Sequence, residues 1–152
     1  MSETVQQTFV IQKIYTKDIS FESPSSPGIF SSNFQPQLSI DLNVESKKLE
    51  ADAYDVVVRV TVTTKVEENV AFLCEVKQAG VFTITGFNEA EMGYMLGVQA
   101  PGILFPYARE AVSDLVTRGG FPQLLLEPVN FELMYHEHLQ KMEGGSETPT
   151  AQ

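Results

Sequence analysis

Apolar and polar residues alternate along much of the first half of the chain, which is the pattern of half-buried β-strands. The alternation is cleanest over residues 38–45, and residues 54–65 and 70–84 carry it through longer runs that are rich in β-branched side chains. Residues 8–16 are apolar with a less regular alternation, and they are interpreted as a first strand. The intervening residues 17–37 hold three prolines and several serines, so a long loop is expected there.

A helical period replaces the alternation in the second half. Between residues 106 and 118, small and medium apolar residues recur at intervals of three and four on one face: Ala108, Ala111, Val112, Leu115 and Val116. Pro106 suits the first turn of this helix, and Gly119 with Gly120 supplies a left-handed stop at its end. Because the stripe is built from small side chains, the helix is expected to pack closely on a large flat surface.

Two further segments with helical character complete the chain. Asn88 is a candidate N-cap for residues 89–98, and Asn130 is a candidate N-cap for a last helix. Strands followed by helices indicate an α+β fold, in which a four-stranded antiparallel sheet carries the C-terminal helices on one face. We expect residues 1–143 to form a single domain and residues 144–152 to form a flexible polar tail.

Charge and composition narrow the function. The chain has 152 residues, and ten Lys and Arg against twenty Asp and Glu give a formal net charge of −10. An acidic chain is a poor match for nucleic acid, whose phosphates need a basic surface, and it suits basic partners instead. The first residues are not expected to form a signal peptide, because they have neither a basic nor an apolar region, and no apolar run approaches the ~20 residues that span a bilayer. A cytoplasmic protein without direct membrane insertion is therefore expected.

The sequence carries no motif of a nucleophilic hydrolase, a zinc protease, a phosphate-binding loop or a dinucleotide-binding fold. His136 and His138 fall on different faces of a helix, so with Glu132 they make only a weak metal site, and a solvated helix face is the favoured interpretation. Cys74, the single cysteine, alternates with Phe72 and is interpreted as a buried structural thiol. We therefore expect no catalytic residue, no metal and no cofactor, in a protein that is not an enzyme.

Four blocks of sequence stand out, in order along the chain. They are Ile14–Glu22 (IYTKDISFE), Ala71–Val76 (AFLCEV), Ile103–Glu110 (ILFPYARE), and Phe121–Leu124 (FPQL) followed by Pro128–Phe131 (PVNF). Together they resemble the signature blocks of the SecB export chaperones, and the resemblance extends over nearly the whole domain.

The resemblance implies a fold, an assembly and a function. The fold is a four-stranded antiparallel sheet with a long helix behind it. The assembly is a homotetramer, a dimer of dimers in which helices lie between two sheets. The function is that of an ATP-independent holdase, which binds unfolded preproteins of secreted proteins, keeps them competent for translocation and delivers them to the SecA motor ATPase.

The resemblance also implies site residues. Four positions match those that contact SecA in the family: Asp18, Glu22, Leu73 and Glu75. The alternation by itself places Leu73 and Glu75 on the strand face opposite Phe72 and Cys74. Cys74, Val76 and Gln78 match positions where changes disturb the family's tetramer. The helix stripe is expected to be partly a subunit interface, through Ala108, Ala111, Val112 and Leu115.

A holdase must recognise what unfolded chains share, which is exposed apolar side chains and free backbone. Its binding surface should therefore be long, apolar and tolerant of sequence. The candidate groove is formed by aromatic residues of the 17–37 loop lying beside the apolar face of the last helix: Phe21, Phe30, Phe34, Phe131, Leu133, Met134 and Leu139.

Two alternatives remain open from the sequence. SecB-like proteins include holdases dedicated to one toxin–antitoxin pair, and the sequence does not separate such a role from general export. A small enzyme of the hot-dog type also wraps a sheet around a helix, but that fold places its central helix early, whereas the helices predicted here come last.

Overall fold

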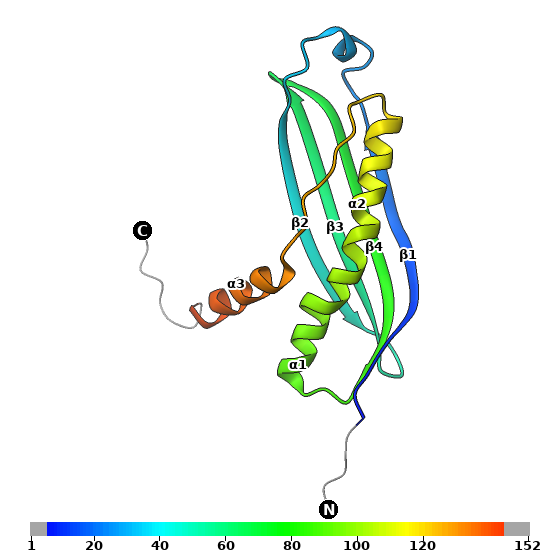
Figure 1. The fold of residues 1–152 in the computed structure, drawn as a ribbon, viewed down its shortest axis with the longest axis vertical. Coiled ribbons are helices and arrows are strands. Elements are labelled where there is room, and N and C mark those ends of the chain that lie inside the picture. The colour runs from blue at the N-terminus through cyan, green and yellow to red at the C-terminus, as the bar shows by residue number, and fades with distance from the viewer. Residues whose placement is uncertain (1–5, 145–152) are drawn as a thin grey trace, which may run out of the picture.

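The four strands are Thr8–Glu22 (β1), Gln37–Lys48 (β2), Ala53–Val66 (β3) and Asn69–Thr85 (β4) in the computed structural model, which describes residues 6–144. All pairs are antiparallel, and the order across the sheet is β1–β4–β3–β2, so β1 and β2 are the edge strands. Short turns connect β2 to β3 and β3 to β4, whereas the connection after β1 crosses to the far edge (Figure 1). The predicted four-stranded antiparallel sheet is confirmed.

β1 is longer than the sequence pattern predicts. It continues through Glu22, so the first part of the expected 17–37 loop is strand, and only a short 3₁₀ turn at Gly28–Ser31 (η1) follows before β2. The pairing of β1 with β4 shifts register between Ile11 and Lys13 and again between Thr16 and Asp18. Each bulge moves the following side chains out of phase, which explains why the alternation is irregular in this strand.

The helical segments join into one long stretch. α1 (Glu89–Tyr94), a π-helical turn (Met95–Gln99, η2) and α2 (Ala100–Arg118) follow each other without a break. Pro106 therefore lies inside α2 and not in its first turn, which corrects the predicted helix start. The predicted cap at Asn88 is confirmed, because its side chain accepts a hydrogen bond from the backbone N–H of Glu91 at 2.8 Å.

α2 lies lengthwise across the sheet and buries its apolar stripe there (Figure 1). Leu104, Ala108 and Val112 are completely buried against the valine-rich faces of β3 and β4. Gly80 on β4 allows this approach, because a Cβ at that position would lie 3.0 Å from Cδ2 of Leu104 and 2.9 Å from the ring of Phe82. The expected close packing of a small-residue stripe on a flat surface is confirmed.

α2 ends at Arg118, and the two glycines of the predicted stop have different backbone conformations. Gly119 keeps a helical conformation, while Gly120 adopts the left-handed one, with φ of 91°. Residues 121–130 then return over the same face of the sheet toward α3 (Phe131–Gly144), where Asn130 Oδ1 accepts a hydrogen bond from the N–H of Leu133 at 3.0 Å (Figure 1). The predicted tail lies outside the described residues beyond Gly144.

Candidate functional site

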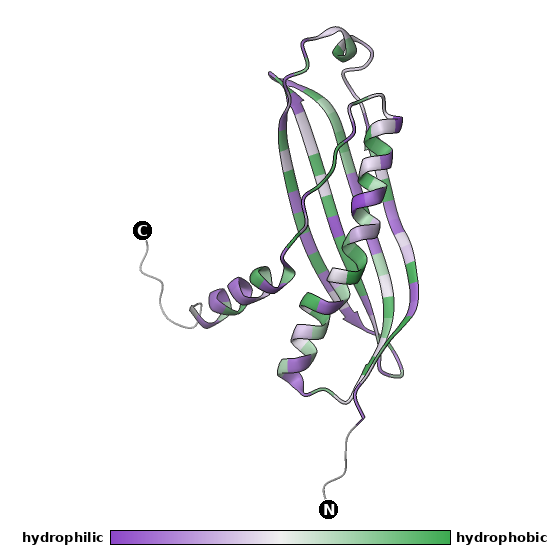
Figure 2. Ribbon diagram, in the orientation of Figure 1, coloured by the Kyte–Doolittle hydropathy of each residue, from purple (hydrophilic) through white to green (hydrophobic). Residues whose placement is uncertain are grey.

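The sheet has one face under the helices and one open face (Figure 1). Along β4, Phe72, Cys74 and Val76 are buried beneath the helices, whereas Leu73 and Glu75 are half-buried on the open face. The opposite orientations predicted from the alternation are therefore confirmed, and Figure 2 shows the same alternation of hydropathy along the strands.

Four residues on the open face match the positions implied for SecA contact. Glu22 lies directly opposite Leu73, and Glu75 and Asp18 follow on the same face at two- and four-residue intervals along their strands. Asp18 and Glu22 are exposed. The hydroxyl of Thr61 donates a hydrogen bond to Oε2 of Glu75 at 2.9 Å and so orients that carboxylate. We call Asp18, Glu22, Leu73 and Glu75 the acidic patch; it is three carboxylates around one partly exposed leucine.

A second polar contact on the open face ties the edge strand to the centre of the sheet. The Tyr15 hydroxyl donates a hydrogen bond to Oδ1 of Asp55 at 2.6 Å, and Nζ of Lys17 lies 3.5 Å from Oδ2 of the same carboxylate. Burial, followed by the hydrogen bond to Asp55 and the negative charge of that carboxylate, raises the pKa of Tyr15 to about 12. This hydroxyl remains protonated at neutral pH and acts as a structural donor.

On the helix side, the aromatic residues of the connection after β1 gather around Phe121. The ring centroids of Phe30 and Phe34 lie 5.2 Å and 5.9 Å from that of Phe121. Phe21 stacks on Phe72 at 5.6 Å and completes the group. Phe30 is 50% exposed, so this aromatic cluster is packed at its base and open at its rim.

The last helix does not lie beside this aromatic cluster, which corrects the predicted groove. α3 packs near η2, where Phe131 is buried with its ring 5.9 Å from Phe105 and where Tyr135 covers two glycines of the α1–η2 stretch. The reason is the length of α2, which carries the chain to one end of the sheet before residues 121–130 bring it back (Figure 1). Leu133 is 55% exposed on α3, Leu139 is also exposed and Met134 is half-buried.

Sequence reasoning did not single out Leu38, Ile40 and Leu125, which are among the apolar residues that the structure leaves uncovered. Leu38 and Ile40 of β2 are 46% and 49% exposed although they face the helix side, since they pair with residues of β3 that α2 covers. Leu125, in the segment that returns over this face, is 68% exposed. The clean alternation of residues 38–45 was the available signal, but it could not reveal that β2 is an edge strand beyond the reach of α2. We call Phe30, Leu38, Ile40 and Leu125 the apolar rim.

The residues expected at the subunit interface mostly lie inside the chain's own core. Cys74, Val76, Ala108 and Val112 are 0–1% exposed between the sheet and α2, and Gln78 is 4% exposed with Nε2 donating to the carbonyl oxygen of Tyr15 at 3.0 Å. Ala111 and Leu115 are half-buried. The structure thus corrects their placement: the stripe packs on its own sheet, and the buried members offer no surface to a second copy. Burial raises the pKa of the Cys74 thiol to about 11, as fits the predicted structural thiol.

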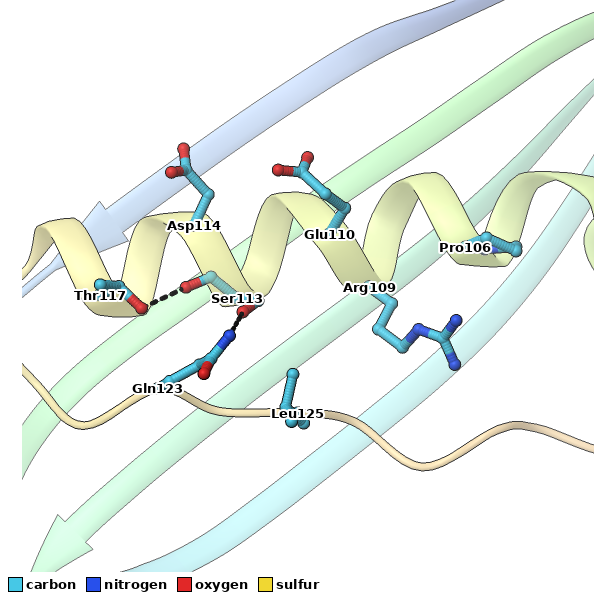
Figure 3. Close-up of a pocket in the computed structure, with 8 residues that line it drawn as sticks. All are labelled: Pro106, Arg109, Glu110, Ser113, Asp114, Thr117, Gln123 and Leu125. Atoms are coloured by element: carbon cyan, nitrogen blue, oxygen red, sulfur yellow. Dashed lines mark hydrogen bonds between the residues drawn. The ribbon is translucent and has the colours of Figure 1, made fainter.

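The outward side of α2 is polar instead. A hollow separates it from the returning segment and is lined by both charge signs and hydroxyls (Figure 3): Pro106, Arg109, Glu110, Ser113, Asp114, Thr117, Gln123 and Leu125. Thr117 donates a hydrogen bond to the carbonyl oxygen of Ser113 at 2.9 Å, and Gln123 contacts the Ser113 hydroxyl at 3.4 Å. This surface suits polar contacts and has no catalytic arrangement of side chains.

Residues 6–144 were compared with the geometry of metal sites and of membrane-spanning helices. That part of the chain holds no group of three or more His, Cys, Asp or Glu placed to bind a metal ion. None of its helices is long and apolar enough to cross a membrane.

Comparisons with known proteins agree with this geometry. The model of the family described as "Preprotein translocase subunit SecB" matches residues 2–142. The protein-export protein SecB of Hydrogenovibrio crunogenus is 66% identical over 139 residues, which cover 91% of this chain and 93% of that protein. Among solved structures, the Mycobacterium tuberculosis SecB-like chaperone Rv1957, in complex with a ChAD peptide from the HigA1 antitoxin, superposes with a TM-score of 0.66.

That structure shares 18% sequence identity and covers 80% of this chain and 90% of its own, so it supports the fold alone. The family match and the 66% identical relative go further, because they cover nearly the whole chain and name the same family. The SecB family is a family of chaperones. The chain belongs to the SecB family and is a protein-export chaperone.

Proposed function

We propose that this chaperone is an ATP-independent holdase of the cytoplasm, which binds unfolded preproteins and delivers them to SecA. One observation carries the proposal: the two faces of the sheet display different chemistry. The open face presents the acidic patch, and the helix face presents apolar side chains that the core leaves uncovered. A protein that must hold a nonspecific apolar client and a specific basic partner at the same time needs two such separate surfaces.

The apolar rim is the proposed start of the client surface. An unfolded chain offers apolar side chains every few residues, and burying one against Leu38, Ile40 or Leu125 gains about 1.5–3 kcal/mol at most. A few such contacts give binding that is useful and still reversible. Because β2 is an edge strand, its free backbone groups can also pair with an extended client. Phe30 and, further along, Leu133 and Leu139 of α3 extend the apolar surface.

The acidic patch is the proposed SecA contact. Three carboxylates around the side chain of Leu73 suit a basic partner segment with one apolar anchor, and the net charge of −10 accelerates its approach. A holdase serving one toxin–antitoxin pair has less support, because the 66% identical relative is a protein-export protein.

The proposed assembly is a homotetramer, a dimer of dimers. β1 supports it, because this 15-residue edge strand exposes Val10, Ile11 and Ile19 at 43–45% each and leaves its outer backbone groups without a partner strand among residues 6–144. Such an edge is an aggregation hazard unless it pairs with another strand, and the β1 of a second copy is an obvious partner. The polar outward side of α2 would then meet another pair of subunits, with the helices lying between two sheets (Figure 3).

Charge reversal at Glu75 tests the SecA contact. We expect Glu75→Lys to weaken SecA binding at least tenfold while leaving client binding unchanged, because the residue lies on the open face, away from the apolar rim. Glu50→Lys is the matched control, since it makes the same charge change in the turn between β2 and β3, at the far end of the sheet. Calorimetric titration of each variant with SecA and with an unfolded precursor measures both affinities. An equal loss of both for Glu75→Lys, or an equal loss of SecA binding for Glu50→Lys, contradicts the assignment.

A further inference from the structure

The open face also carries a small basic hollow in the middle of the sheet. Its volume is about 70 Å³, and all four strands contribute to its lining: Lys17, Asn43, Glu45, Val57, Arg59 and Lys77. We call these residues the basic hollow. Three of the ten basic residues of an acidic protein thus converge on one site, and the acidic patch does not use them.

Two of these cations face each other directly. Arg59 on β3 and Lys77 on β4 are register partners on the same face of the antiparallel pair. A like-charge pair in this position is destabilising. Asp18 lies opposite Lys77 on β1, yet the ion pairs found within residues 6–144 join other residues, and neither Arg59 nor Lys77 takes part in one. Both side chains are half-buried, so water screens the repulsion between them only in part.

Carboxylates also border the basic hollow: Asp18 lies opposite Lys77, and Glu75 lies two residues from Lys77 on the same face of β4. The Lys17 side chain is 50% exposed, and its Nζ forms an ion pair with Oδ2 of Asp55 at 3.5 Å. Glu45 brings the single carboxylate of the lining, and its Oε1 accepts a hydrogen bond from Nδ2 of Asn43 at 3.3 Å. Within the lining itself, three basic groups and one acidic group give a net charge of +2, and the neighbouring carboxylates lie outside it.

We propose that the basic hollow binds a phosphate group. A phosphate monoester or inorganic phosphate is close to a dianion at neutral pH, which matches the charge of the lining, and its oxygens accept from guanidinium and ammonium donors arranged on two sides. The volume of about 70 Å³ is comparable to that of one phosphate group, so any remainder of the ligand lies outside on the open face. The bound anion separates Arg59 from Lys77 electrostatically and removes the repulsion between them.

Calorimetric melting of the full chain with inorganic phosphate tests the proposal. Ten millimolar phosphate is expected to raise the midpoint temperature by about 2 °C or more over sodium chloride of equal ionic strength, because a ligand that binds the folded state stabilises it. Arg59→Gln and Lys77→Gln are each expected to remove most of this rise. Lys77→Gln is also expected to raise the midpoint in chloride alone, since it removes the like-charge pair, and this gain distinguishes a lost site from a damaged fold.

Lys65→Gln is the matched control, because Lys65 is exposed on β3 outside the basic hollow and its loss should leave the phosphate effect intact. A repeat with adenosine monophosphate distinguishes the source of the anion: tighter binding than inorganic phosphate assigns the site to a phosphorylated molecule, and equal or weaker binding assigns it to free phosphate. The proposal is overturned if the midpoint temperature is the same in phosphate as in chloride of equal ionic strength. It is also overturned if Arg59→Gln, Lys77→Gln and Lys65→Gln reduce the phosphate effect equally.

Discussion

At the scale of single residues, polar contacts organise the open face of the sheet. Tyr15 and Lys17 reach from the edge strand to Asp55 on β3, across β4, and Thr61 reaches from β3 to Glu75 on β4. These bonds fix the carboxylates that would otherwise be mobile on a solvated strand. The same bonds also predict how the stability of the protein depends on pH.

The Tyr15 hydroxyl predicts a loss of stability at alkaline pH. Its pKa is about 12 in the folded chain against an ordinary value near 10, so between these values the unfolded chain releases a proton that the folded chain retains. The stabilisation is complete below pH 10 and is lost as the pH rises toward 12. Tyr15→Phe should therefore show a shallower decline in the free energy of unfolding from pH 10 to pH 12, as measured by urea titration.

The decline in Tyr15→Phe is shallower and not absent, because the hydrogen bond to Glu132 also raises the pKa of Tyr94. Tyr107→Phe is the control, since that side chain is 50% exposed on the outward side of α2. A slope in Tyr15→Phe equal to that of the unmodified protein contradicts this role for Tyr15.

Alanine substitutions at Gly80 and Gly102 are expected to change the free energy of unfolding in opposite directions. Gly80→Ala places a Cβ within 3.0 Å of Leu104 and Phe82, both fully buried, and should lower the free energy of unfolding by about 1–3 kcal/mol. Gly102→Ala, inside α2 with nothing within 4 Å of the new Cβ, should raise it by about 0.5–1 kcal/mol. Chemical denaturation of both variants measures the difference. If Gly80→Ala were as stable as the unmodified protein, α2 could not pack on β4 as described.

At the scale of elements, the sequence predicted each strand and the caps, because these depend on local patterns. Period-two alternation specifies β2, β3 and β4, and an Asn before each helix specifies where α1 and α3 begin. The extension of β1 was hidden because its bulges break the alternation. The start of α2 was predicted wrongly from Pro106, because a proline that usually lies in the first turn of a helix is here tolerated within one.

The candidate site was predictable only where it follows from a single strand. The face shared by Leu73 and Glu75 is a property of β4 alone, and it was predicted. The groove was misplaced because its position depends on how far α2 carries the chain, which no local pattern encodes. The exposure of Ile40 depends on β2 being an edge strand, a fact of topology.

The apolar rim predicts a selective loss of client binding. Ile40→Ser combined with Leu125→Ser removes two exposed apolar side chains and should weaken the binding of an unfolded client about tenfold or more, which corresponds to about 1.4 kcal/mol. The free energy of unfolding should change little, because both side chains are largely solvated. Fluorescence titration with a reduced, unfolded precursor measures the affinity. Leu49→Ser, in the turn after β2, is the control, and unchanged client binding in the double variant contradicts the placement of the client surface.

At the scale of the whole molecule, one chain is too small to hold an extended client. A client segment of 20 residues spans about 65 Å, which exceeds the sheet's longest strand, 17 residues at about 3.4 Å each. Grooves that continue from one copy to the next remove this limit, and the β1 edges offer the means of joining them. In the proposed tetramer, the acidic charge of each chain would keep the assembly soluble while its apolar surfaces stay open.

The most direct test of the central claim is light scattering on a sizing column, first with the protein alone and then with a reduced, unfolded, slowly folding precursor, without nucleotide. The account predicts a mass near 68 kDa, four times the 16.9 kDa of one chain, which increases by the mass of a client chain when the precursor is added. A monomer or dimer that elutes unchanged in the presence of the precursor contradicts it.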